Sequence, residues 1–182
     1  GVVVPRLAEE PVIRVGLFAP DSLKFSFVSN EDSYVIWTSS STAAGVLPMG
    51  EKAVLSYVGG LYRIQSGTAV FESGEFIRLT PQTNKAAVFV LPDILRTISG
   101  RGKTVYNEYR GTVEWRLADD TKKVYIINEL PLEYYVKGIA ETANNSPMEY
   151  QKALLTAART YAYFTAEHTG KHSKRHFDVV AH

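Results

Sequence analysis

The sequence contains no cysteine among its 182 residues. Disulfide bonds and cysteine-based zinc sites are therefore excluded. The absence fits a cytosolic protein, and it fits equally well an exported bacterial protein that avoids disulfides. The absence of cysteine therefore does not decide whether the protein is cytosolic or exported.

No apolar run reaches the length of about 18 residues that a membrane-spanning helix needs. The start, Gly1 to Pro5, has neither the basic region nor the apolar stretch of a signal peptide. The chain stops at His182 within an apolar, strand-like run. We therefore interpret residues 1–10 as a linker or boundary segment and expect a domain that is incomplete at its C-terminus.

Neither sign of charge is in excess, because the sequence has 20 basic and 19 acidic residues. A dedicated nucleic-acid binder usually shows a basic surplus on one face. We therefore expect no nucleic-acid partner. A neutral polymer such as a glycan is compatible with this balance and with the eleven tyrosines.

Strand signals dominate the first two thirds of the chain. Val12–Phe18 is rich in β-branched residues, and Gly59-Gly60 separates two alternating runs, which is a hairpin signal. Polar and apolar residues alternate strictly over Thr112–Leu117, as in a half-buried strand. A turn at 118–121 leads from there to a further strand at 124–127.

Helical signals begin after Asn128. Pro131 suits a first helical turn, and the stretch from Leu132 to Glu141 contains no breaker except Gly138. This pattern predicts a first helix.

A second helix is predicted after a loop at 142–145. Ser146 can cap its N-terminus, Pro147 suits the first position, and Glu149 would close a capping box. The helix is expected to run to about His168, with Gly170 as its stop. Strands followed by two helices predict an α+β fold, β-rich in its first two thirds, with the helices carrying the site.

Glu141 stands out among the carboxylates because it lies between the two predicted helices. Rigid elements on both sides can hold a loop residue while the loop exposes it. A facing helix N-terminus would favour its ionised form, whereas burial against Tyr134, Tyr135 or Tyr161 would raise its pKa. The alternative is a surface glutamate that only complements a helix dipole.

Arg159 lies inside the alanine-rich second helix. An arginine among small residues can hold a carboxylate through two parallel hydrogen bonds. The alternative is an ordinary exposed helix arginine.

Three histidines, His168, His172 and His176, are spaced by four residues. On a helix this spacing would align metal ligands, but Gly170 interrupts the helix and basic residues surround the group. We therefore favour solvated histidines and no cofactor. A zinc site involving His176 and His182 remains the alternative.

Several segments together resemble the SpoIID/LytB family. They are Ile13–Leu17, Tyr109–Gly111, Asn128–Glu141, Lys152-Ala153, Ala157–Ala162 and Phe177–Val180. The spacing from Glu141 to Pro147 and on to Arg159 fits the family pattern without a gap. The resemblance assigns residues 11–182 to one SpoIID-like domain, with a β-rich part at 11–105 and a motif-bearing part at 106–182.

Some positions depart from the family pattern. Thr142-Ala143 stands where Met-Pro usually follows the glutamate, and Leu154 stands where glutamine is common. The cysteines that bind zinc in some members are missing. The family's C-terminal sheet is expected after residue 182.

The resemblance implies lytic transglycosylase activity on the glycan strands of peptidoglycan, with Glu141 as catalytic acid and base. One carboxylate can serve both steps, so no second one is needed. Glu133 is about 12 Å away along a helix, which is awkward for a pair, and Glu149 is expected to be engaged in the capping box. Substrate-binding roles fall to Arg159, Tyr161, Tyr134, Tyr135 and Ser146.

Two rival functions share these motifs. One is a non-catalytic enhancer of a cell-wall amidase, and the other is a glycan-binding module with an inactive site. All three functions imply a bacterial, sporulation-related or cell-wall protein outside the cytoplasm, secreted or anchored by a segment that this sequence does not contain.

Overall fold

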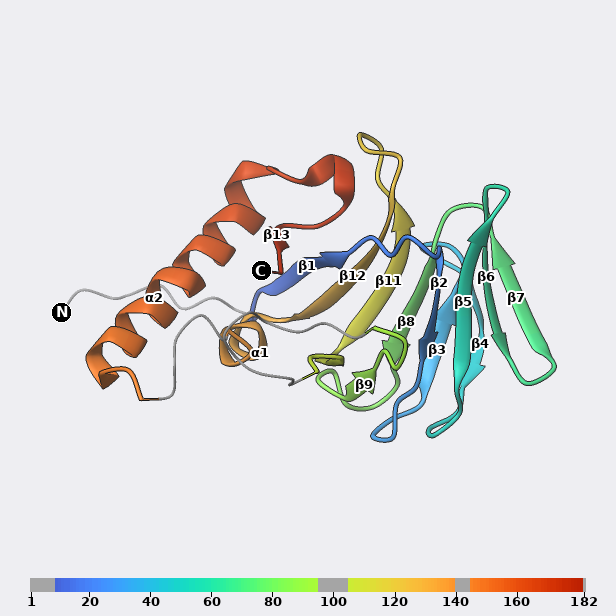
Figure 1. Cartoon of the computed structure of the whole chain (residues 1–182), viewed down its shortest axis with the longest axis horizontal. Helices are drawn as coiled ribbons and strands as arrows, with labels where there is room; N and C mark the ends of the chain where they lie inside the picture. The colour runs from blue at the N-terminus through green and yellow to red at the C-terminus, as the bar shows by residue number, and fades with distance from the viewer. Residues whose placement is uncertain (1–8, 95–104, 140–144, 182) are drawn as a thin grey trace.

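A computed structural model describes residues 9–94, 105–139 and 145–181 of the chain. Strands occupy the described chain up to Pro131, and two helices follow (Figure 1). The predicted α+β fold is therefore confirmed. None of the described helices is both long and apolar enough to cross a membrane.

The larger sheet has seven strands in the order β13-β1-β12-β11-β8-β3-β4. Every neighbouring pair is antiparallel except β1 and β13, which run parallel. The strands are β1 (Val12–Phe18), β3 (Tyr34–Trp37), β4 (Ala43–Leu47), β8 (Ile77–Pro81), β11 (Thr112–Leu117), β12 (Val124–Pro131) and β13 (Val179–Val180).

A second sheet of four antiparallel strands covers one face of the first (Figure 1). The hairpin predicted at Gly59-Gly60 is confirmed as its β5–β6 turn. A short pair, β9 (Val88–Val90) with β10 (Glu108–Arg110), lies beside the two sheets. The four strands are β2 (Lys24–Phe27), β5 (Ala53–Val58), β6 (Leu61–Ser66) and β7 (Ala69–Ser73).

The core fills the space between the two sheets. The Trp115 ring of β11 meets Phe25 of β2 edge to face at 5.0 Å, and Phe27 meets Tyr34 in the same way at 4.9 Å. Such aromatic pairs contribute beyond the area that they bury. The alternation predicted for Thr112–Leu117 therefore points its apolar residues into this core.

The other face of the seven-stranded sheet carries a row of charges. Alternation turns Arg14, Arg78, Glu114 and Glu129 away from the core, one on each of the adjacent strands β1, β8, β11 and β12. Arg14 pairs with Glu114 at 2.8 Å and with Glu129 at 2.7 Å. Arg78 pairs with the same two carboxylates. We call these four side chains the ionic row.

The strand before the first helix is longer than the sequence predicted. Residues Asn128 to Pro131 continue β12, because Glu129 and Leu130 pair with Arg14 and Ile13 of β1. Helix α1 spans Leu132–Lys137 and ends at Gly138. Long-range pairing with β1 thus overrides the local signal after Asn128.

The predicted capping box of the second helix is wrong. Helix α2 spans Met148–Phe164, its N-cap is Pro147, and no side chain caps it. Pro147 has a ψ of 136°, so Ser146 lies one residue too early to reach the first turn. Glu149 instead pairs with Lys152 at 2.9 Å.

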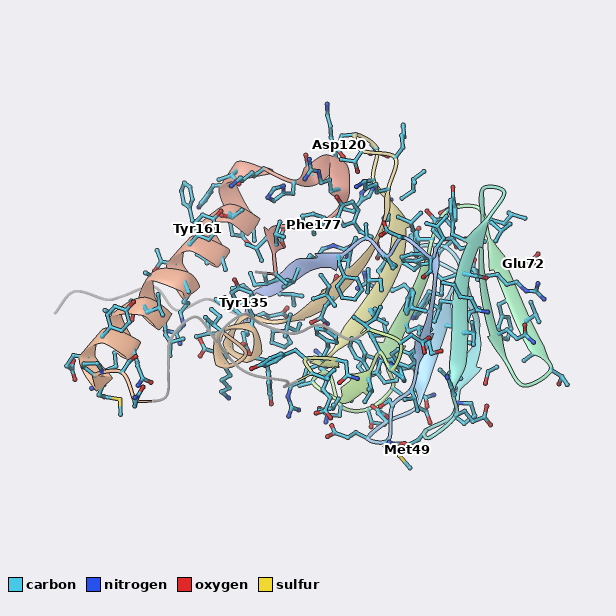
Figure 2. All side chains as sticks on the ribbon, in the orientation of Figure 1. Met49, Glu72, Asp120, Tyr135, Tyr161 and Phe177 are labelled. Carbon is cyan, nitrogen blue, oxygen red and sulfur yellow. The ribbon has the colours of Figure 1, made fainter. Side chains whose placement is uncertain are left out.

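The segment after α2 folds back onto the sheet. A π-helical turn, Thr165–Thr169, ends at Gly170 in the left-handed conformation, as predicted for the stop. A 3₁₀ turn, Ser173–Arg175, then leads to β13. Phe177 lies between this segment and the sheet (Figure 2), where its ring packs against Gly16 of β1.

Gly111 has the least room for a side chain among the described glycines. Its φ is +86°, and an added Cβ would lie 2.5 Å from the carbonyl oxygen of Glu129. Its carbonyl also accepts a hydrogen bond from the Tyr34 hydroxyl. Gly111→Ala combines a strained φ with a backbone clash, and we expect it to lower the free energy of unfolding by about 3 kcal/mol.

Gly60→Ala is the matched control, because Gly60 has a φ of +89° and nothing within 4 Å of the added Cβ. It should show the cost of the backbone strain alone, about 1 kcal/mol. Thermal unfolding of both variants measures the difference. Equal losses of Tm would contradict the clash at Gly111.

Candidate functional site

The predicted site belongs to the helical hairpin that α1 and α2 form. Glu141 lies in the chain between them and is outside the described residues, as are its neighbours 140 and 142–144. The described chain stops at Ile139 and resumes at Asn145. The five other predicted site residues are described.

Arg159 ties the two helices together. Its Nε and Nη2 donate to Oε1 and Oε2 of Glu133, each at 2.9 Å. Of the two interpretations that the sequence left open for Arg159, the structure shows the two-point contact with a carboxylate, and its partner is Glu133 in the first turn of α1. These hydrogen bonds lower the pKa of Glu133 and keep it ionised. We call this pair the α1–α2 clasp.

Tyr134 presents an exposed ring beside two cations. The Lys137 ammonium lies 4.9 Å from the ring centroid, and the Arg110 guanidinium lies 5.9 Å from it. Arg110 comes from β10, so the Tyr109–Gly111 segment meets the first helix here. Arg110 was not among the predicted site residues, although it lies within Tyr109–Gly111, one of the segments that resemble the family.

The remaining predicted residues have different surroundings. Tyr135 is half-buried and packs against the core. Tyr161 lies on α2 (Figure 2), 53% exposed, and its hydroxyl oxygen accepts a hydrogen bond of 3.4 Å from Lys171. Ser146 is half-buried, and its carbonyl accepts a hydrogen bond from Gln151. The contacts therefore link Arg159 to Glu133, Tyr134 to Arg110 and Lys137, and Tyr161 to Lys171.

One face of α2 is apolar and open to solvent. Ala153, Ala157, Tyr161 and Phe164, which share a helical face, are all exposed, and Tyr150 extends the same stripe. Only Ala162 of α2 is buried. We call these five residues the α2 stripe.

The histidines have separate partners. His168 contacts the Phe164 ring at 5.2 Å, His172 contacts Phe177 at 5.1 Å, and His176 lies 3.7 Å from Asp119. In the described part of the chain, no three His, Asp or Glu side chains gather as metal ligands would. His182 is outside the described residues.

Two hollows open on the charged face of the seven-stranded sheet. One, of about 350 Å³, is lined by Arg14 and Arg116 and by residues of the segment after α2. The other, of about 270 Å³, is lined by Arg78, Glu129 and neighbouring strand residues. Tyr134, Tyr135, Ser146, Arg159 and Tyr161 line neither of them.

Residues 120–182 match the family model of SpoIID, described as stage II sporulation protein. We call residues 120–182 the SpoIID segment, because they match this model. The resemblance predicted from the sequence is thereby confirmed there. Neither a curated protein nor a solved structure matches the chain.

The SpoIID segment contains every predicted site residue, together with β12, both helices and β13. It excludes Arg110, which reaches Tyr134 from β10, and Arg14 and Arg116, which line the larger hollow. Residues from earlier in the chain therefore complete the surroundings of the segment.

The α1–α2 clasp should stabilise the helical hairpin of the SpoIID segment. We expect Glu133→Gln to speed amide hydrogen exchange in α1 and in the facing turns of α2, because the charged two-point contact is lost. The matched control is Glu149→Gln, since Glu149 pairs with Lys152 within α2 alone. Hydrogen–deuterium exchange measures both variants. Unchanged exchange in α1 of Glu133→Gln would contradict the prediction.

Proposed function

We propose that this protein is a lytic transglycosylase that cleaves peptidoglycan glycan strands, with Glu141 as the acid and base. The observation that carries the proposal is the SpoIID segment, within which Glu141 follows α1 and precedes α2. The α1–α2 clasp supports it, because a catalytic loop needs rigid elements at both ends.

The proposed reaction needs one carboxyl group. Protonated Glu141 gives its proton to the glycosidic oxygen between N-acetylmuramic acid and N-acetylglucosamine, and the bond from that oxygen to the muramyl C1 breaks. The Glu141 carboxylate then takes the proton of the muramyl 6-hydroxyl, whose oxygen bonds to C1 and closes a 1,6-anhydro ring. The carboxyl group ends protonated, as it began, and no water is consumed.

Glu133 is a poor candidate for a second catalytic carboxylate. Arg159 holds both of its oxygens and lowers its pKa, so it is not a proton donor near neutral pH. Glu149 is exposed and paired with Lys152. These surroundings favour a reaction with one carboxylate over hydrolysis with two.

The other site residues are proposed to bind the glycan or to position the helices beside it. The exposed ring of Tyr134, with Arg110 and Lys137 at its side, can stack on a sugar and donate to its hydroxyls. Tyr161 offers a second exposed ring on α2. Arg159 and Tyr135 hold α1 in position, and Ser146 lies where the loop enters α2. The substrate implies a location outside the cytoplasm.

The test is the chemical nature of the cleaved ends. Purified peptidoglycan is incubated with the protein, and the soluble products are identified by mass spectrometry. We expect muropeptides with 1,6-anhydro ends, and none from Glu141→Gln. Reducing ends in their place would identify a hydrolase, and identical digests from wild type and Glu141→Gln would rule out Glu141 as the catalyst.

A second candidate function is a glycan-binding or amidase-enhancing role. The α2 stripe favours it, because exposed aromatic rings beside small residues form a surface on which a partner can dock. In the same assay, no soluble products from the protein alone, together with faster digestion by an added wall amidase, would support this role over catalysis.

A further inference from the structure

The larger hollow lies at the end of α2 that is farther from Met148. Its walls are the strands β1 and β11 and the segment after α2, including Thr165, Gly170 and Ser173. Thr165 lies 17 residues after Met148, about 25 Å along α2. The volume of about 350 Å³ is within the range of small-ligand sites.

Arg116 is the most loosely held charge in the hollow. Glu114 accepts from Arg14 at 2.8 Å and from Arg78 at 3.0 Å, whereas Arg116 reaches it only at 3.5 Å. The Arg116 guanidinium also stacks over Phe76 at 5.1 Å, and 34% of its side chain is exposed. Most of its five N–H donors therefore have no strong acceptor among these contacts.

His176 adds a group that can both donate and accept. Burial and the nearby Arg116 lower its pKa, so the imidazole is neutral near pH 7. The residue has a left-handed φ of 65°, which is uncommon for a residue other than glycine and is found more often at functional sites. Arg14 fixes this conformation by donating from Nε to the His176 carbonyl at 2.7 Å. A π-helical turn, also frequent at functional sites, forms the opposite wall.

Charges of both signs line the hollow. Arg14 and Arg116 lie in its wall together with the carboxylate of Asp178, which accepts from the backbone N–H of Arg14 at 2.9 Å. An anion would approach Asp178, and a cation would approach the arginines. A hydroxyl group suits both, because it donates to a carboxylate and accepts from a guanidinium.

We propose that this hollow is a second binding site that takes a sugar unit of a neutral glycan. Arg116 donates to a ring hydroxyl, Asp178 accepts from one, and His176 and Ser173 contact the remainder. The choice of a glycan rests on the proposed function, but binding here does not require catalysis by Glu141. A glycan strand that reaches from this hollow to the start of α2 would lie alongside that helix.

The probe is an oligomer of four N-acetylglucosamine units, added to the whole chain and followed by NMR. We expect the backbone amides of Ala166, Gly170 and Ser173 to shift on titration, and to shift equally in Glu141→Gln. Loss of lytic activity in that variant with these shifts retained would separate the two sites. No shift at these amides in wild type would overturn the proposal.

Arg116→Gln tests the role of the loosely held arginine. We expect it to weaken binding at the hollow about tenfold, the effect of losing one charged hydrogen bond. Arg175→Gln is the matched control, because its side chain is equally exposed and pairs with Asp120 without lining the hollow. Equal affinities in the two variants would overturn the role of Arg116.

Ser173→Ala is a second variant that leaves the ionic row intact, and it should weaken binding less than Arg116→Gln. Acetate and inorganic phosphate serve as competing probes. We expect neither to shift the three amides. Shifts with acetate or phosphate that Arg116→Gln removes would identify an anion site and reject the sugar.

Discussion

Glu141→Gln is expected to lower the rate of 1,6-anhydro product release by about 10²- to 10⁴-fold. This is the usual contribution of a group that transfers a proton in the transition state. Glutamine has a similar shape and can still donate a hydrogen bond, but it cannot give up a proton to the glycosidic oxygen or take one from the 6-hydroxyl. The initial rate of soluble muropeptide release, measured by chromatography, gives the effect.

Two variants separate this chemical loss from a structural one. Glu149→Gln removes an exposed carboxylate of α2, and the rate should stay close to wild type. Glu133→Gln removes the α1–α2 clasp, and the rate should fall less than in Glu141→Gln, since the clasp only positions α1. Equal losses in Glu133→Gln and Glu141→Gln would mean that Glu141 acts through structure and not through proton transfer.

Glu114→Gln is expected to lower the free energy of unfolding by about 3 kcal/mol, because it removes a buried carboxylate that pairs with two half-buried arginines and leaves Glu129 as their shared acidic partner in the ionic row. The Glu114 side chain is only 3% exposed and accepts from both Arg14 and Arg78. At this chain length the loss corresponds to a fall in Tm of about 6–12 °C. Glu72→Gln is the control, because its pair with Arg63 is exposed and 3.9 Å long. A Tm unchanged in Glu114→Gln would contradict the structural role of the ionic row.

The same variant should change how stability depends on pH. Burial raises the pKa of Glu114, but Arg14 and Arg78 outweigh it, and the pKa lies below its ordinary value of 4.5. Stability from such a group is complete above its unfolded pKa and is lost as pH falls through its folded pKa. Wild type should therefore lose more stability than Glu114→Gln below about pH 4.5. Urea unfolding from pH 7 to pH 3 measures the two slopes.

Local signals in the sequence predicted the elements that local physics decides. The Gly59-Gly60 hairpin, the alternation of Thr112–Leu117 and the stop at Gly170 all depend on a few adjacent residues. The order of strands before helices followed from the same signals. The α+β class could therefore be predicted without any knowledge of long-range contacts.

Features that depend on distant partners were missed or misread. β12 continues to Pro131 because it pairs with β1, more than 110 residues earlier in the chain. The ionic row joins four strands whose side chains are neighbours only in the folded sheet. The capping box failed for a local reason, since Pro147 itself occupies the N-cap.

The sequence was enough to choose candidate site residues, but not to predict which residues they contact. A two-point contact between Arg159 and a carboxylate was one of two interpretations that the sequence allowed, and Glu133 as its partner needed the angle between α1 and α2. Arg110 could not be placed near Tyr134 until β9 and β10 were seen to pair. Glu141 as the catalyst stays a prediction.

The position of β1 bears on whether the SpoIID segment could be transferred to another protein without the rest of the chain. β1 lies between β12 and β13, which are not neighbours in the sheet, and it comes from the opposite end of the described chain. The SpoIID segment contains the two outer strands and lacks the middle one. The matched segment therefore does not contain a continuous set of neighbouring strands at this edge of the sheet. A recombination that moved it would have to bring Val12–Phe18 along, or find an equivalent strand in the recipient.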